Sequence, residues 1–376
     1  MTPQPPLIVH VVNALRMGGL ENGLVNLINR LPADQFRHAI ICLTDFDDFA
    51  QRIQRDDVEI IALHKKPGKD PIWYWNMWRA LRRLRPAIVH TRNLATIEAQ
   101  FLAMLAGVRG RVHGEHGWDM HDLGGSNPKY VLLRKLLKPF IQMFIPLSAE
   151  IDDYLRNRVG VVPGRITRIC NGVDITRFKP PGIGYRRPEQ LFGTGDIVIG
   201  YVGRMEQVKD PLNLVDAFIQ GVARHPESRN TVRLAMVGDG ALFQPIAERL
   251  EENGLSDRVW LPGHSNDIAG LLTNCDIFVL PSRAEGISNT ILEAMATGLP
   301  VVATRVGGNA ELLEEGENAM LVPAADSQAL FAAIWNYVQS SELRHKHGRK
   351  SRLMAESKFS IDKMVSDYSR VYRGLL

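Results

Sequence analysis

Short apolar runs alternate with amphipathic segments along almost the whole chain, and this alternation constrains the fold more than any other feature. A run such as Leu7–Asn13 has the length of a strand that is buried on both faces. Leu212–Ala223 instead repeats its apolar residues at three- and four-residue spacing, which is typical of a helix. Repeated strand-helix units fold around parallel sheets. We therefore predict an α/β fold throughout.

The candidate strands fall into two sets, separated by a stretch rich in proline and glycine that matches neither periodicity. The first set comprises Leu7–Asn13, Ala39–Leu43, Glu59–Leu63, Ala87–His90, Arg111–Glu115, Met143–Leu147 and Ile166–Cys170. The second set comprises Ile197–Gly203, Val232–Val237, Val259–Leu261, Ile277–Pro281, Val301–Ala303 and Met320–Val322.

A chain of 376 residues is longer than a single core usually supports, so two Rossmann-like lobes are expected. We predict an N-terminal domain at residues 1–178, a linker at 179–196, a C-terminal domain at 197–358 and a C-terminal helix at 359–376. That helix is expected to pack back toward the N-terminal domain. Since ligands of open parallel sheets bind beyond the carboxyl ends of the strands, we expect the two sheets to face each other across a cleft.

The composition is that of a folded, soluble protein, with 45% apolar and 23% charged residues. The three cysteines are isolated in sequence, which indicates neither a disulfide framework nor a zinc site. The N-terminus lacks the basic leading region and cleavage site of a secretory signal, and no uncharged apolar stretch approaches the ~20 residues that a membrane-spanning helix needs. We therefore expect a cytoplasmic protein.

The most informative segment runs from Pro281 to Ala296, a strand end followed by a turn and a helix. Glu285 falls in the turn, and the amides that follow form a helix N-terminus, which favours phosphate. Glu293, one turn into the helix, can reach sugar hydroxyls. The alternative is an ordinary helix start, with Asn289 as its N-cap and Glu293 on the solvent face. The candidate donor-binding residues of this segment are Glu285, Gly286, Ile287, Ser288, Asn289, Thr290 and Glu293.

Two cations follow the first strand of the second set: Arg204, directly after Gly203, and Lys209. A departing diphosphate gains negative charge as its bond to a sugar breaks, and fixed cations stabilise that charge. The alternative is a pair of solvated surface cations. In the first half, Gly18 and Gly19 follow the first strand and precede a helix, so their amides can meet the same diphosphate or simply form a tight turn.

Other chemistries are less well supported. The three-glycine dinucleotide fingerprint is absent, as are the serine-hydrolase elbow and the P-loop, so no cofactor is expected. A metal site has to be considered where histidines and carboxylates gather, but their spacing does not match a ligand set. His116 is better explained as a hydrogen-bond donor to a sugar, or as a residue that only shapes its loop. The residues of this cluster are His113, Glu115, His116, Asp119, His121 and Asp122.

Together these motifs resemble the retaining glycosyltransferases of family four, which have the GT-B fold, over nearly the whole chain. The resemblance lies in Gly18 to Glu21, His116, Asn171 to Asp174 with Phe178, Gly203-Arg204 with Lys209, and Glu285 through Ala296. One departure is Asp210, since many members have glycine after the lysine. Within the family the chain looks nearest to bacterial sugar transferases of exopolysaccharide assembly.

The resemblance implies a metal-independent, retaining transfer from a nucleoside diphosphate sugar to a glycan or lipid-linked acceptor held by the N-terminal domain. It assigns Arg204 and Lys209 to the donor diphosphate, Glu285 and His116 to the sugar, Glu293 to the ribose and Gly19 to the phosphates. The leaving phosphate would accept the acceptor's proton. Two alternatives are a nucleotide-sugar epimerase of the same fold and a non-catalytic nucleotide-sugar-binding subunit. Donor, acceptor, linkage and oligomeric state are not encoded in any pattern that we can interpret.

The first half is also basic, since residues 1–178 contain 24 lysines and arginines against 17 aspartates and glutamates, and the remainder contains 21 against 24. Nucleic-acid binders concentrate charge more strongly, so none is expected as a partner. Basic and aromatic residues mix in two segments, which suits an anionic membrane surface on the inner face of the membrane. The alternative is a buried aromatic cluster beneath a solvated basic face. These segments are Lys65–Arg92, with Lys69, Trp73 and Trp75, and Lys129–Phe140, with Arg134, Lys135 and Lys138.

Overall fold

The computed structural model describes residues 4–376 except 69, 119–121, 123, 183, 186, 188–191 and 194. The predicted residues Lys69, Asp119 and His121, and parts of the predicted linker, lie outside the described residues. The described chain forms two compact units. The first comprises Met1–Gly172 together with Ile361–Leu376, and the second comprises Val173–Ser360. The chain therefore passes between the units twice.

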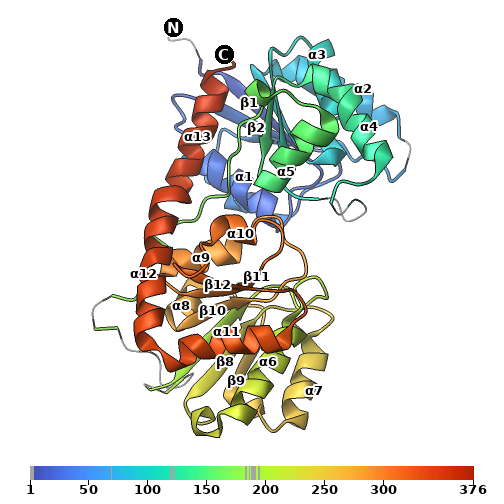
Figure 1. Cartoon of the computed structure of the whole chain (residues 1–376). Coiled ribbons are helices and arrows are strands. Elements are labelled where there is room, and N and C mark those ends of the chain that lie inside the picture. Colours follow the sequence, from blue (N-terminus) through green and yellow to red (C-terminus); the bar gives the residue numbers. More distant parts are fainter. Residues whose placement is uncertain are drawn as a thin grey trace. The chain divides into compact units, whose positions relative to one another are not determined.

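The first unit contains a six-stranded parallel sheet of order β3-β2-β1-β4-β5-β6. Alternate strand residues face opposite sides, so Val9 and Val11 pack under α2 and α3, whereas Ile8 packs with α13. Figure 1 shows α2 and α3 on one side of this sheet and α1 and α13 on the other. The strands are β1 Leu7–Val12, β2 Arg37–Cys42, β3 Glu59–Ala62, β4 Ile88–Arg92, β5 Gly110–Glu115 and β6 Met143–Pro146. The helices are α1 Gly19–Arg30, α2 Ile72–Leu84, α3 Ala99–Leu105, α4 Pro128–Leu137, α5 Ala149–Tyr154 and α13 Ile361–Arg373.

The second unit has the same architecture, with a parallel sheet of order β12-β11-β10-β7-β8-β9. Its helices form two groups, since α6 packs against α7 and α11, and α9 packs against α8 and α12. The strands are β7 Ile197–Val202, β8 Val232–Val237, β9 Val259–Gly263, β10 Ile277–Leu280, β11 Val301–Thr304 and β12 Ala319–Val322. The helices are α6 Pro211–Arg224, α7 Phe243–Glu252, α8 Ile268–Thr273, α9 Asn289–Thr297, α10 Asn309–Leu312, α11 Ser327–Gln339 and α12 Ser341–Lys358.

The predicted two-lobed α/β fold is confirmed, but one predicted strand is wrong. Ile166–Cys170 is not a strand, and only Ile166 forms an isolated bridge, with Phe144 of β6. The amides of Thr167 and Ile169 donate to the carbonyls of Phe144 and Pro146. Since Pro146 has no N–H to donate in return, a regular ladder does not form.

Candidate functional site

The strand order places the candidate residues of the second unit at the point where the chain reverses direction across the sheet. β7 lies at the centre, with β8 and β9 on one side and β10 to β12 on the other. In sheets of this kind ligands bind at the switch point, beyond the carboxyl ends of the two central strands. Arg204 and Lys209 follow β7, and Glu285 follows the neighbouring β10. The sequence alone does not give this adjacency.

Lys209 and Glu285 are in direct contact. Lys209 Nζ lies 2.5 Å from Glu285 Oε1, and Ser282 Oγ donates to the same oxygen over 2.6 Å. Only 6% of the Glu285 side chain is exposed, compared with 20% for Lys209. Thr304 Oγ1 donates to the Ser282 carbonyl over 2.6 Å and so fixes the start of the loop. The carboxylate is held in place on one oxygen, and its other oxygen makes no hydrogen bond to any described residue.

Asp210 follows Lys209, at the position where many members of the family that the sequence resembles have glycine. Its backbone is left-handed, with φ 48°, a conformation that glycine adopts readily and most other residues avoid. The Asp210 carboxylate is buried and receives two hydrogen bonds from Arg283, Nε to Oδ2 at 2.9 Å and Nη2 to Oδ1 at 3.2 Å. The Arg283 amide also donates to the Val208 carbonyl. The two loops that carry Lys209 and Glu285 are therefore tied together.

Arg204 has an exposed side chain and makes no ion pair with any residue in the described part of the chain. Its backbone is fixed because Tyr201 Oη donates to the Arg204 carbonyl over 3.0 Å. The loop also lies close to Gly238, where an added Cβ would be 1.9 Å from the Gly203 carbonyl oxygen. The guanidinium thus extends from a rigid turn and is available to an anion.

The helix that follows Glu285 begins at Asn289, and its N-cap is Ser288. Ser288 Oγ accepts from the Ile291 amide over 3.3 Å, so the suggested Asn289 cap is wrong. The turn before the helix is tightly packed, because the Gly308 amide donates to the Gly286 carbonyl over 2.8 Å. An added Cβ at Gly308 would lie 2.2 Å from that oxygen. Ile287 is buried, and the helix therefore starts from a fixed backbone.

Glu293, in α9, is half-buried rather than on an open solvent face. Burial raises the pKa of its carboxyl to about 7, although the nearby Arg177 acts in the opposite direction. No hydrogen-bond partner for this carboxyl is found among the described residues. A desolvated carboxyl without a partner is a candidate for binding hydroxyl groups.

In the first unit, Gly18 is the N-cap of α1, but a side chain already lies at this helix end. An added Cβ at Gly18 would be 2.3 Å from Glu21 Oε2, so the Glu21 carboxylate is folded back against the start of the helix. Burial raises the pKa of Glu21, whereas its own backbone amide and the charge of Arg92 lower it. The glycine pattern at Gly18 and Gly19 gave no sign of this internal carboxylate.

Arg92 is a buried charged residue near the candidate residues of the first unit, and no motif in the sequence marks it. It is buried at the end of β4, beside the switch point of the first sheet, and its Nη1 lies 3.1 Å from His10 Nδ1. We predicted Arg92 as the last residue of a membrane-facing segment, and its burial corrects that prediction. The available signal was its position just after the predicted strand Ala87–His90, at the carboxyl end where ligands of parallel sheets bind.

His116 follows β5, and its amide donates to Asn93 Oδ1 over 2.7 Å. Its ring is turned back over the strand, since an added Cβ at Gly114 would lie 2.6 Å from His116 Nε2. Burial, with the nearby Arg92, lowers the pKa of His116 to about 3, so the ring is neutral. Its Nε2 is buried and has no hydrogen-bond partner among the described residues.

The neighbouring histidine and carboxylate are used structurally. His113 Nε2 lies 3.3 Å from Glu115 Oε1, and Arg134 donates to both Glu115 oxygens at 2.6 and 3.1 Å. Burial alone would raise the pKa of Glu115, but the bonds from His113 and Arg134 bring it to about 2. Within the described residues, no group of three or more His, Cys, Asp or Glu side chains is placed to hold a metal ion.

The predicted basic and aromatic segments are only partly on the surface. Trp73 packs in the core and Arg134 is buried against Glu115, so neither belongs to a docking face. Apolar side chains of α2 and α4 are exposed nevertheless: Ile72, Trp75, Leu132 and Leu136. Across the described helices, none is both long enough and apolar enough to cross a bilayer.

Comparison with known proteins agrees with this architecture. The family model described as Glycosyltransferase Family 4 matches residues 17–177, and the model described as Glycosyl transferases group 1 matches residues 196–340. A curated relative from Escherichia coli, UDP-Gal:alpha-D-GlcNAc-diphosphoundecaprenol alpha-1,3-galactosyltransferase, is 28% identical over 97% of this chain and 96% of its own length.

Solved structures show the same fold. A glycosyltransferase from Rickettsia africae superposes with a TM-score of 0.85 at 21% identity and covers 99% of both chains. HepE of Anabaena, in complex with UDP and glucose, superposes with a TM-score of 0.80 at 20% identity and covers 98% of this chain and 99% of its own. One family model matches most of the first segment of the first unit and the other matches most of the second unit, and the chain is a glycosyltransferase that belongs to family four and has the GT-B fold.

Proposed function

We propose that this glycosyltransferase moves a sugar from a nucleoside diphosphate sugar to a glycan or lipid-linked acceptor of polysaccharide biosynthesis, with retention of anomeric configuration and without a metal ion. The observation that supports the proposal best is the contact of Lys209 with Glu285 at the switch point of the second sheet, where the loop after β7 also carries Arg204, which forms no ion pair with a described residue. The UDP and glucose bound to HepE and the UDP-galactose in the name of the E. coli relative support a uridine nucleotide as donor.

The cations serve the leaving group. Arg204 and Lys209 stabilise the negative charge that develops on the diphosphate as the glycosidic bond breaks, and the N-terminus of α9 with Gly203 and Gly286 adds backbone donors. Lys209 is already ordered by Glu285 before a donor binds. Little reorganisation is then needed when the diphosphate arrives, which is the condition under which fixed charges lower a barrier most.

The two glutamates serve the hydroxyl groups of the donor. Glu285, with one oxygen held by Lys209 and Ser282, accepts hydrogen bonds from the transferred sugar through its other oxygen. Glu293 accepts from the ribose in its ionised form, which increases as the pH rises through about 7. His116 contributes a neutral imidazole to the sugar, and Gly18 and Gly19 contribute amides to the phosphates. The leaving phosphate accepts the acceptor's proton, so no side chain acts as a nucleophile.

The test begins with a thermal-shift screen of nucleoside diphosphates and their sugars, because a ligand raises the melting temperature only if it binds the folded protein. The best donor is then incubated with lipid-linked and soluble glycan acceptors, and the anomeric configuration of the product is read by NMR. An α-linked product from an α-linked donor supports retention, and a β-linked product contradicts it. Activity that is lost in EDTA and restored by a divalent cation contradicts metal independence.

We also propose that the first unit lies on the inner face of the membrane when it receives a lipid-linked acceptor. The support is the exposure of Ile72 and Trp75 on α2 and of Leu132 and Leu136 on α4, near the exposed cations Arg79 and Lys135. Co-sedimentation with vesicles tests this. Binding to anionic vesicles that falls in the variant Trp75→Ser/Leu132→Ser supports docking, and equal recovery with neutral and anionic vesicles contradicts it.

A further inference from the structure

A cavity of about 530 Å³ lies in the second unit, at the edge of the sheet opposite to the candidate donor site. Cys275 and Asp276, which line it, directly precede β10, and Leu299 and Pro300 directly precede β11. Because the strands are parallel, these residues are at the amino edge of the sheet, whereas Arg204 and Glu285 are at the carboxyl edge. A ligand in this cavity therefore makes no contact with the proposed donor residues.

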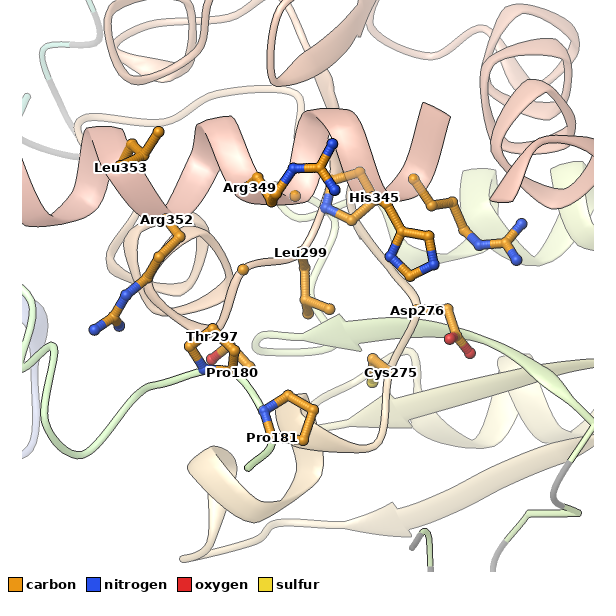
Figure 2. A pocket seen from close by; sticks show the side chains of 14 residues that line it. Pro180, Pro181, Cys275, Asp276, Thr297, Leu299, His345, Arg349, Arg352 and Leu353 are labelled. Atoms are coloured by element: carbon orange, nitrogen blue, oxygen red, sulfur yellow. The ribbon is translucent and has the colours of Figure 1, made fainter. Parts of the chain in front are cut away.

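The walls of the cavity are mostly apolar. Leu299, Cys275 and the prolines Pro180 and Pro181 line it on the side away from α12. Figure 2 shows these residues below α12, from which Arg349 and His345 extend. Residues 345, 349 and 353 recur every four positions and so share one face of the helix. Leu353, the third of them, is 61% exposed although it lines an apolar cavity.

The shape of the cavity is fixed where α12 crosses closely over the end of α9. An added Cβ at Gly348 of α12 would lie 2.2 Å from the carbonyl oxygen of Gly298, which ends α9 with φ 83°. Arg352 fastens the same crossing, since its Nη1 donates to the carbonyls of Ala296, Ile175 and Phe178 at 2.6 to 3.1 Å. The backbone around the cavity is thus fixed by contacts within the chain itself.

The charges around the cavity leave one cation free. Arg352 is occupied by carbonyls, and Arg344 donates to the Val338 carbonyl at 3.1 Å. Asp276, the acidic group of the lining, is paired with Arg187 at 2.9 Å. Arg349 is exposed at the rim and has neither an ion pair nor a hydrogen bond from its side chain to any residue in the described ranges.

We propose that this cavity is a second ligand site, which takes a small organic anion with a flat apolar body and a single phosphate, sulfonate or carboxylate group. The apolar body packs against Leu299, Pro181 and Leu353, and the anionic group pairs with Arg349. The volume is within the range of sites that enclose small organic molecules. The site is independent of the proposed transfer reaction, since it shares no residue with the donor site.

The experiment is a fluorescence titration of the full chain with anilinonaphthalene sulfonate, an apolar ring system with one sulfonate. We expect saturable binding of one dye per chain, weakened at least about tenfold in Arg349→Glu and in Leu299→Asp, because a charge-assisted hydrogen bond and an apolar wall are lost. The matched control is Lys346→Glu, an exposed lysine of the same helix that does not line the cavity, and Arg349→Lys keeps the charge. Both should bind within about threefold of the parent.

Melting temperatures, measured alongside, separate loss of the site from loss of the fold. Equal affinity in the parent and in folded Arg349→Glu overturns the proposal, and so does displacement of the dye by UDP, which would put it in the donor site. Displacement by phenyl phosphate supports a soluble natural ligand. Displacement by dihexanoyl phosphatidic acid, with no effect of phenyl phosphate, supports a lipid headgroup in the same site.

Discussion

The two sheets share one strand order but accommodate buried polar groups in opposite ways. In the first, neutral histidines surround the buried cation Arg92: His10 Nδ1 lies 3.1 Å from Arg92 Nη1, His10 Nε2 lies 3.0 Å from His38 Nδ1, and His90 Nδ1 lies 2.8 Å from Tyr372 Oη. In the second, side chains at the strand ends form ion pairs, Lys209 with Glu285 and Arg283 with Asp210. The same topology therefore supports neutral histidines around a buried cation at the centre of the first sheet and ion pairs between loops at the centre of the second.

The largest effect is expected from charge deletion in the second unit. Lys209→Ala, Glu285→Ala or Arg204→Ala should lower kcat/KM by at least about 100-fold, following typical losses when groups that stabilise a transition state are removed. Initial rates with the best donor measure this. Arg229 is exposed and lies before β8, at the amino edge of the sheet. Arg229→Ala is therefore the control and should leave the rate unchanged. Near-normal turnover in all three variants would refute the proposed donor site.

Acid should unfold the first unit before the second. Burial, with nearby arginines, lowers the pKa of His38 and His116 to about 3 and that of His10 and His90 well below 6.5. The unfolded chain then binds more protons than the folded one below pH 6.5, so stability is full above that pH and falls as the pH drops toward 3. Each such histidine contributes about 1.4 kcal/mol of destabilisation per pH unit in this window.

Hydrogen exchange at pH 7.5 and pH 5.5, followed by mass spectrometry, measures the acid effect unit by unit. We expect the strands β1, β2 and β4 to lose protection at the lower pH, and β7 and β10 to keep it. His38→Gln should reduce the pH dependence of the melting temperature. Equal loss of protection in both sheets would show that the neutral histidines do not set the acid sensitivity.

A smaller effect, roughly tenfold in kcat, is expected when the link between the two donor-site loops is cut. Arg283→Ala leaves the buried Asp210 carboxylate without its partner and frees the loop that holds Lys209. Asp210→Gly/Arg283→Ala should recover part of the loss, because glycine adopts φ 48° without strain and no carboxylate is left unpaired. A double-mutant cycle on kcat measures this, and simple additivity would contradict the link.

The smallest effect concerns Glu293, whose pKa is raised to about 7 by burial. Its carboxylate form increases as the pH rises through 7, so KM for the donor should fall a few-fold between pH 6 and pH 8. Glu293→Gln, which cannot ionise, should have a higher KM with a flatter pH profile. If the parent and Glu293→Gln share the same pH profile, the titrating group is another residue.

The sequence predicts the regular parts of the molecule well, because the central strands of both sheets are buried on both faces and form clear apolar runs. The prediction fails where a single residue disrupts regular pairing. Pro146 has no amide N–H to donate to the predicted strand Ile166–Cys170. The sequence also cannot tell which side of a helix a residue faces when basic and apolar residues mix. For this reason the sequence leaves open whether Trp73 and Arg134 are on a membrane-facing surface or buried, and the structure shows that both are buried.

The candidate site also has a part that the sequence predicts and a part that it does not. The identities of Arg204, Lys209 and Glu285 follow from residues at strand ends, but the contact of Lys209 with Glu285 depends on which strands are neighbours in space. In the sequence, Asp210 is only a departure from the family pattern. Its positive φ and its pairing with Arg283 show why an aspartate is tolerated there. Contacts between residues far apart in the chain produce no periodic pattern in the sequence.

The interrupted first unit has a consequence for synthesis on the ribosome. Its core includes Met364, Tyr368 and Tyr372 of α13, which are translated after the whole of the second unit. The second unit is continuous in sequence, so it can complete its fold while the first still lacks one wall of its interior. The first unit is thus the first to be translated and the last to complete its fold. Until then a nascent chain exposes the apolar face that α13 covers, and chaperones act on such surfaces.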